Sequence, residues 1–276
     1  FFAAVVLGLL LDRWTFGKSR MTLPIKQSVE ETPMKAIILC GGRGRRMESD
    51  RAKALVKVGK RPLIFYTIRQ YILAGIRDFV LCGGYQIDQI DALFAKLGHV
   101  LEYHDGYSRY GLDLFHVPCT VELYDTGIDT KKVDRLRSVL KDFSEEMFCL
   151  SYCDIICDVD ISKLIAKHRK NGATMTITVV NPQSRYGHVI CDESFAIEMR
   201  EKPILEDIWI NGGIMVASAE VIPLLLNLQI EGDLEDSILA NLAAAGKLGV
   251  YRHRGFWRSI ETQKDVEEMR SLGDSV

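Results

Sequence analysis

The stretch 34–58 constrains the fold of this chain more than any other part. It opens with the apolar run 35–39, which is too short for an independent helix. The next loop contains Gly41, Gly42, Gly44, Arg45 and Arg46, and Lys53 comes shortly after it. Glycine lets a backbone approach phosphate oxygens closely and point its N–H groups at them. The pattern predicts a buried strand that delivers a phosphate-binding loop.

This loop matches neither of the two best-known phosphate loops. A Walker loop needs Lys followed by Ser or Thr directly after its last glycine, and a dinucleotide fingerprint needs a further glycine that opens a helix. Taken alone, the loop is equally compatible with a phosphate cradle and with a plain tight turn.

Length and composition place the chain among ordinary globular proteins. Its 276 residues, 47% of them hydrophobic, are enough for one large core or two small domains. We expect a single domain over residues 34–276, with residues 98–120 as an insertion and candidate oligomer contact. The formal net charge of −2 argues against a dedicated nucleic-acid binder.

Residues 1–33 differ in character from the rest of the chain and are interpreted as an N-terminal extension of separate status. The apolar run 1–11 is shorter than the roughly 20 residues that span a bilayer, and it lacks a basic flank before it. Three interpretations of these residues remain open. They could be the tail of a truncated membrane segment, an upstream extension before a start at Met21 or Met34, or a packed appendage. We expect no stable membrane anchor.

Strand and helix signals alternate after the glycine loop. Apolar turns predict helices over 63–74 and 86–97, and a buried strand over 78–82 lies between them. This rhythm is typical of an α/β protein with a Rossmann-like open sheet, mixed but mainly parallel, and helices on both faces. Ligands of such sheets bind at the carboxyl ends of the strands. Residues 98–120 interrupt the rhythm with weak periodicity.

The seven cysteines lie mostly among apolar neighbours and show no compact spacing of the secreted kind. Their number and placement predict reduced thiols and a cytoplasmic protein. Cys149, Cys153 and Cys157 recur every fourth residue, but a strand followed by a loop does not turn that spacing into a metal cluster.

Asp154 ends the apolar run 147–153 and is the metal candidate of the chain, because a carboxylate at a strand's carboxyl end faces the expected ligand site. Asp158 and Asp160 come closely after it. An EF-hand interpretation fails because the required glycine and glutamate are missing. We interpret Asp158 and Asp160 as caps of a helix that begins near Ile161.

With these elements in order, residues 34–270 resemble the sugar-1-phosphate nucleotidylyltransferases, and among them the glucose-1-phosphate cytidylyltransferases most. The motifs that carry the resemblance are the glycine loop with Lys53, Tyr152-Cys153-Asp154, Arg185-Tyr186-Gly187, Glu201-Lys202-Pro203, Asn211-Gly212-Gly213 and Gly255-Phe256-Trp257. The element Asp125-Thr126-Gly127, followed by Arg135, resembles the corresponding element of the cytidylyltransferase branch of this family. Six ordered matches are far more specific than any single one.

The chain departs from the family pattern at several positions. Arg45 replaces a threonine, Cys153 and Ile155 replace glycines beside the metal aspartate, and Asp134 replaces a glycine. Glu261 occupies the position of the second metal aspartate. Glutamate keeps the oxygen ligand but adds a methylene, and Mg²⁺ demands tight octahedral geometry.

The resemblance implies a nucleotidyltransferase of the GT-A-like type that joins a nucleoside triphosphate, CTP on this pattern, to glucose 1-phosphate and releases pyrophosphate. It implies Mg²⁺ held by Asp154 and Glu261, with Arg46, Lys53 and Lys202 on the phosphates. Further roles by analogy are Gly41, Gly42, Gly44, Arg45 and Gly84 at the nucleotide, and Gly187, Glu201 and Asn211 at the sugar. A homo-oligomer is also expected.

Three alternatives stay open. The same fold could use UTP, GTP or dTTP. The substitutions around Asp154 and at 261 are compatible with a catalytically impaired homologue that binds nucleotide sugars and regulates. A sugar-transferring enzyme of similar fold usually shows an Asp-x-Asp strand end, and Asp158-Val159-Asp160 has that spacing but lies beyond the expected strand end.

Overall fold

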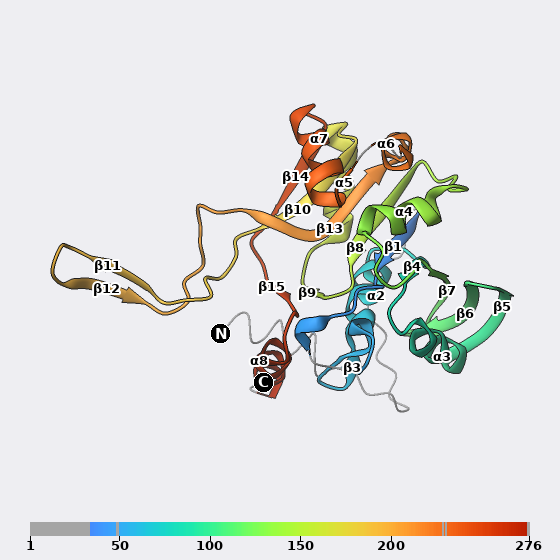
Figure 1. The fold of residues 1–276 in the computed structure, drawn as a ribbon, viewed down its shortest axis with the longest axis horizontal. Coiled ribbons are helices and arrows are strands. Elements are labelled where there is room, and N and C mark those ends of the chain that lie inside the picture. Colours follow the sequence, from blue (N-terminus) through green and yellow to red (C-terminus); the bar gives the residue numbers. More distant parts are fainter. Residues whose placement is uncertain (1–33, 48–49, 228, 230, 275–276) are drawn as a thin grey trace.

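The computed structural model describes residues 34–47, 50–227, 229 and 231–274 (Figure 1). The predictions made for residues 1–33 therefore lie outside the described residues. Within the described part, no helix has the length and apolar character needed to cross a membrane.

The fold is built on a nine-stranded sheet with the order β14-β10-β13-β8-β1-β4-β7-β6-β5. The strands are β1 (Lys35–Leu39), β4 (Asp78–Gly83), β5 (Gly98–His104), β6 (Tyr107–Leu114), β7 (Val117–Asp125), β8 (Met147–Tyr152), β10 (Met175–Val180), β13 (Ile210–Ser218) and β14 (Leu248–His253). Strands β6 and β13 run antiparallel to the others. This confirms the prediction of an open, mixed and mainly parallel sheet.

Both faces of the sheet are covered because the central strands are apolar on both sides. Alternate residues of β1 belong to two separate cores, with Ala36 and Ile38 in one and Ile37 and Leu39 in the other. The first core contains residues of α2 (Leu63–Leu73), α3 (Ile87–Leu97) and α5 (Ile161–Asn171), and the second those of α4 (Lys132–Leu140), α6 (Ile222–Leu226), the π-helical turn η4 (Leu234–Leu239) and α7 (Ala240–Ala244). Helices on both faces are thereby confirmed.

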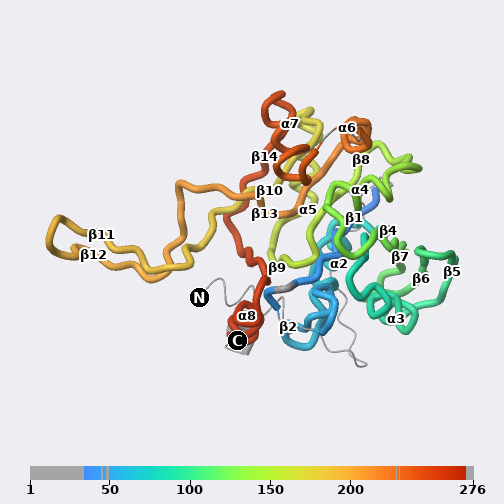
Figure 2. The backbone as a smooth tube through the Cα atoms, in the orientation of Figure 1, coloured from blue at the N-terminus to red at the C-terminus, as the bar shows by residue number. Residues whose placement is uncertain are grey.

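A third, smaller core joins the segment after the glycine loop to the C-terminal helix. It packs α8 (Gln263–Asp274) against the segment that carries the two-stranded sheet of β2 (Lys57–Val58) and β3 (Arg61–Pro62). Figure 2 shows the path of the chain from β14 through β15 (Trp257–Ser259) to α8, beside the glycine-loop segment. Strand β15 pairs with β9 (Ile155–Cys157), and the Ile260 amide donates to the Asp154 carbonyl at 2.8 Å. This pairing brings Glu261 next to Asp154.

Residues 181–209, called the arm below, leave the sheet between β10 and β13. The arm carries the hairpin of β11 (His188–Cys191) and β12 (Ala196–Arg200), which extends away from the body of the molecule (Figure 1). Every residue of these two strands is exposed. The predicted hairpin after Gly187 is confirmed, and its length in solvent could not be foreseen.

The structure adds strands where the sequence predicts only a break in the rhythm. Residues 98–114 form β5 and β6, which extend the sheet antiparallel beyond β7. Six of the seven β5 residues are exposed, so this edge strand has no buried face to impose an alternating pattern. Whether 98–120 is an insertion, or an oligomer contact, stays a prediction.

Of the two residues predicted to cap the helix that begins near Ile161, one does so and the other does not. Asp160 caps α5, where its side chain accepts from the Lys163 amide, as predicted. Asp158 does not cap the helix and lies 3.0 Å from His253 Nε2 instead.

Six of the seven free cysteines are buried and Cys191 is exposed. Burial raises the pKa of the Cys82 thiol to about 12, so it stays protonated at neutral pH.

Candidate active site

The glycine loop after β1 forms one wall of a pocket of about 580 Å³ at the carboxyl ends of β1 and β8. Gly41, Gly42, Gly44, Lys53 and Asp154 are among its lining residues. This position is where an open α/β sheet binds its ligands. The structure therefore brings together five residues that the sequence placed in a nucleotide site.

Lys53 and Asp154 form the most sheltered ion pair of the pocket. Lys53 begins the 3₁₀ turn η2 (Lys53–Leu55), and Asp154 lies between β8 and β9. Lys53 Nζ is 2.5 Å from Asp154 Oδ2, and the two side chains are 14% and 24% exposed. A cation and a carboxylate thus meet at one point of the pocket, where a phosphate and a metal ion could be held side by side.

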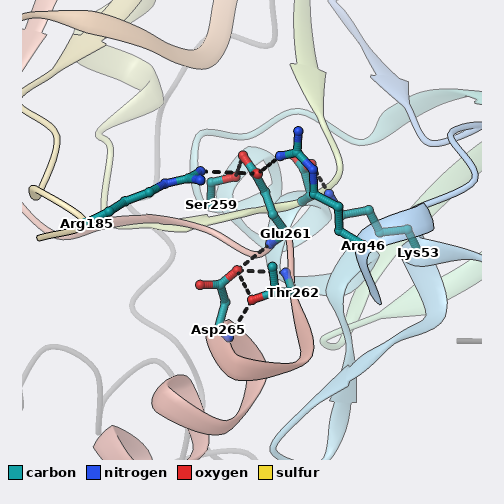
Figure 3. A network of polar contacts seen from close by, with 8 residues as sticks. Arg46, Lys53, Arg185, Ser259, Glu261, Thr262 and Asp265 are labelled. Carbon is teal, nitrogen blue, oxygen red and sulfur yellow. Dashed lines mark hydrogen bonds and ion pairs between the residues drawn. The ribbon is translucent and has the colours of Figure 1, made fainter. Parts of the chain in front are cut away.

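A second ion pair lies close by and is more exposed (Figure 3). Arg46 Nη1 is 2.6 Å from Glu261 Oε2, with side chains 71% and 34% exposed. Arg185, at the base of the arm, approaches the same Glu261 oxygen at 3.6 Å. Asp265 holds the backbone here by accepting from the amides of Glu261 and Thr262 at 2.9 and 2.7 Å. Glu261 therefore meets cations from two distant parts of the sequence.

The donor set of Asp154 and Glu261 fits a magnesium ion. Both are carboxylates, the hard oxygen ligands that Mg²⁺ prefers, and the β9–β15 pairing brings their main chains close to each other. Among the described residues, no group of three or more His, Cys, Asp or Glu side chains is placed to hold a metal. A magnesium ion here would take two protein ligands and complete its shell with water and substrate phosphates, which is its usual mode of binding.

Arg135 is the residue that holds the pocket loops together. Its guanidinium, only 4% exposed, donates to the carbonyl groups of Gly41, Gly83, Gly127 and Ile128 and to the Thr126 hydroxyl. These acceptors lie at or just after the ends of β1, β4 and β7, three neighbouring strands. Burial lowers the pKa of Arg135, yet a guanidinium remains charged in proteins. A buried positive charge, with carbonyl and hydroxyl partners, thus lies beneath the glycine loop.

The same side chain explains two of the glycines. A Cβ on Gly41 would lie 2.1 Å from Arg135 Nη1, and a Cβ on Gly84 would lie 2.5 Å from it. Gly42, in contrast, has open space where its side chain would be, and Gly44 adopts a positive φ of 57°. Gly41 and Gly84 make room for the guanidinium, whereas Gly42 leaves room in the pocket. Gly84 is not among the lining residues.

The other predicted residues lie elsewhere. Glu201, Lys202 and Gly187 belong to the arm and are not among the lining residues of the pocket. Lys202 has a positive φ of 44° and its carbonyl accepts from Gln183. Asn211 lies at the start of β13, where its side chain accepts from the Gly213 amide.

Arg45 lies in the 3₁₀ turn η1 (Arg45–Met47), and its side chain is outside the described part of the structure. The predicted role of Arg45 at the nucleotide therefore stays a prediction.

Sequence reasoning missed a polar cluster at the pocket, of which Lys132, Tyr152 and Asp233 are lining residues. Lys132 Nζ lies 2.7 Å from Glu235 and 3.6 Å from Asp233, and 5.4 Å from the centre of the Tyr152 ring. The Tyr152 hydroxyl donates to Glu235. Burial and this hydrogen bond raise the pKa of Tyr152, so the phenol stays neutral and keeps its proton. No motif signals this cluster, because its members come from three separate segments.

A further ion pair joins the two loops at the pocket. Arg43 donates to Asp129 through two nitrogens at 2.8 and 2.7 Å, and its guanidinium lies 5.7 Å from the centre of the Tyr85 ring. Both charged residues line the pocket. The glycine loop and the loop after β7 are thus linked across it.

Fold and site together define a class: an α/β protein with a pocket at the carboxyl edge of its sheet, where cations and carboxylates are paired. The family model described as nucleotidyl transferase matches residues 35–270. The chain belongs to this family and is a sugar-1-phosphate nucleotidylyltransferase.

Individual relatives agree with this assignment. The probable glucose-1-phosphate cytidylyltransferase of Bacillus subtilis strain 168 is 32% identical, over 87% of this chain and 96% of the relative. The glucose-1-phosphate cytidylyltransferase of Salmonella typhi is 31% identical, over 87% of this chain and 95% of the relative. HddC from Yersinia pseudotuberculosis has a similar fold, with a TM-score of 0.59 at 17% identity over 86% of this chain and 98% of that one.

Proposed function

We propose that this enzyme transfers the cytidylyl group of CTP to glucose 1-phosphate. The observation that carries the proposal is the Lys53–Asp154 pair, 2.5 Å apart beside the glycine loop, because it brings a phosphate-binding cation and a metal-binding carboxylate to one point. The choice of CTP is supported by the similarity to cytidylyltransferases over most of the chain and by the Asp125-Thr126-Gly127 element, whose main chain is bonded to Arg135 at the pocket.

The reaction is one of charge and position. An oxygen of the sugar phosphate attacks the α-phosphorus, a new P–O bond forms, and the bond to the bridging oxygen of the β-phosphate breaks to release pyrophosphate. The nucleophile is already anionic, so no strong base is required. Catalysis therefore consists of alignment and neutralisation of phosphate charge.

Seven of the predicted residues have a defined part in this scheme. Asp154 and Glu261 would hold Mg²⁺, which neutralises charge on the reacting phosphates. Lys53 binds the α- or β-phosphate and Arg46 the departing pyrophosphate. Lys202 binds the phosphate of the sugar, and Glu201 and Asn211 bind its hydroxyl groups. The arm must then contribute the acceptor side of the site, since it carries Lys202 and Glu201.

The decisive experiment is a screen of CTP, UTP, GTP and dTTP with glucose 1-phosphate and Mg²⁺, read as pyrophosphate release. We expect kcat/KM for CTP to exceed that for each other nucleotide by at least about tenfold, roughly the discrimination that one good base contact supplies. A preference for another base would reject the cytidylyl assignment. CTP binding by calorimetry without pyrophosphate release would favour the impaired regulatory homologue.

A further inference from the structure

The charged groups of the candidate site are one another's counter-ions. Lys53 is paired with Asp154 at 2.5 Å, and Arg46 with Glu261 at 2.6 Å. The two carboxylates are those assigned above to the metal, and the two cations those assigned to the nucleotide phosphates. Each of these four charged groups is therefore already engaged by a group of opposite charge.

Glu261 carries a second cation that the proposed mechanism does not use. Arg185 Nη2 is 3.6 Å from Glu261 Oε2, the same oxygen that Arg46 contacts (Figure 3). Arg46 belongs to the glycine-loop segment and Arg185 to the arm. Both sides of the site therefore supply a cation to the same carboxylate.

A metal ion and the side-chain cations would compete for the same two carboxylates. A divalent cation at Asp154 and Glu261 would stand within a few ångströms of the side chains that now pair with them, and like charges at that distance repel. A triphosphate, with several anionic oxygens, attracts the same cations. Each ligand thus favours the rearrangement that the other one needs.

We propose that Lys53, Arg46 and Arg185 are internal counter-ions that change partners when substrate binds. The divalent cation takes the carboxylates, the triphosphate takes the cations, and each ligand alone binds weakly because it must break the pairs without the other's help. Affinity couplings of this kind are reciprocal by thermodynamic necessity. The inference rests on the proposed function for the identity of the ligands.

The two pairs contribute unequally. The Lys53–Asp154 pair is mostly sheltered, with side chains 14% and 24% exposed, so solvent and salt screen it little. The Arg46 side chain is 71% exposed, and a pair in that setting is weak. Removal of Lys53 should therefore free the metal site more than removal of Arg46.

The test measures Mn²⁺ binding to the full chain by electron paramagnetic resonance, without any nucleotide. We expect Lys53→Met to tighten Mn²⁺ binding about tenfold, within the roughly 5- to 150-fold range of site couplings, and Arg46→Met to tighten it about twofold. Lys57→Met is the matched control, because Lys57 is an exposed lysine of the neighbouring strand β2. A gain in affinity cannot come from a variant that fails to fold.

The reverse measurement uses inorganic triphosphate in EDTA, so that it depends on neither a metal nor a base. Asp154→Asn should bind triphosphate several-fold more tightly than the wild type, because Lys53 is released. Asp158→Asn, which changes a carboxylate facing His253, is the control and should bind as the wild type does.

The outcomes separate this inference from the proposed function. Unchanged or weaker Mn²⁺ binding by Lys53→Met would overturn the exchange of counter-ions, whatever the nucleotide screen shows. Tighter Mn²⁺ binding by Lys53→Met, with no pyrophosphate released by the wild type from any nucleotide, would support the exchange and reject the enzymatic proposal.

Discussion

The pocket beside the glycine loop and the base of the arm carry the two halves of the proposed site, and they are held in different ways. The pocket loops are joined by Arg135, which is 4% exposed and bonded to the main chain at the ends of three strands. The arm has an exposed hairpin, and its base is tied to the body by such exposed contacts as Arg258 to Gln183 at 2.8 Å. The nucleotide half is pre-organised by the core, whereas the acceptor half depends on a peripheral element.

This contrast separates the consequences of mutation. Changes in the pocket should affect nucleotide binding and catalysis, and at Arg135 stability as well, because that side chain is buried and bonds the ends of three strands. Changes in the arm should affect binding of the sugar phosphate without lowering the free energy of unfolding, because the hairpin of the arm is exposed.

The largest effect is expected in the pocket, at Asp154. Asp154→Ala should lower kcat on the order of 10³-fold, since it removes a charge-stabilising ligand at the reacting phosphates. Single-turnover pyrophosphate release measures this. Asp158→Asn should retain turnover, and its loss together with normal activity of Asp154→Ala would favour the Asp-x-Asp alternative and reject the metal assignment.

A second change in the pocket comes next. Arg135→Met should raise KM for the nucleotide by roughly 100-fold and lower the free energy of unfolding by about 3 kcal/mol, because buried carbonyls lose their donor. Arg137→Met is the control, since Arg137 also donates to main-chain carbonyls, those of Leu225 and Asn227 at 2.7 Å each, but outside the pocket lining. If both variants lowered stability and neither changed KM, Arg135 would have no part in the nucleotide site.

The acceptor half is tested by Lys202→Met. We expect KM for glucose 1-phosphate to rise about tenfold through the loss of one phosphate contact, with KM for CTP unchanged. Lys170→Met, at an exposed lysine of α5, serves as the reference. An equal change in both KM values would show that the arm also serves the nucleotide half.

The smallest effect is expected at the end of the arm. Phe195→Ser should change the free energy of unfolding by less than about 0.5 kcal/mol, because Phe195 is 75% exposed. Phe94→Ala, at a fully buried phenylalanine, should cost about 3–5 kcal/mol. Chemical denaturation compares the two. A large loss of unfolding free energy for Phe195→Ser would mean that this part of the arm is packed against other protein surface in solution.

Much of the fold could be predicted because local patterns reflect burial. Strand β1 is found at the predicted residues, and α2 and α3 agree within one residue at each end. Their apolar residues recur with the period that their elements require. Strand β5 escaped prediction for the opposite reason, because an edge strand with exposed faces carries no such period.

The candidate site, like the fold, could be predicted only where the signal is local in sequence. Gly42, Lys53, Asp154 and Glu261 could be named from ordered motifs, since each motif is local in sequence. Their pairing could not be named, because Lys53 and Asp154 are 101 residues apart and Arg46 and Glu261 are 215 apart. The sequence also could not assign Gly41 and Gly84 to the space that Arg135 fills.

By itself, then, the sequence determined the family, the α/β architecture and the identity of the charged groups, because these depend on residue types and short spacings. Only the tertiary structure decided which charges neutralise each other, which loops Arg135 joins and how far the arm stands from the core. Those properties depend on distances across the sheet edge, where β1, β8 and the β9–β15 pair converge. Charges attract by distance in space, and the linear order of residues does not contain that distance.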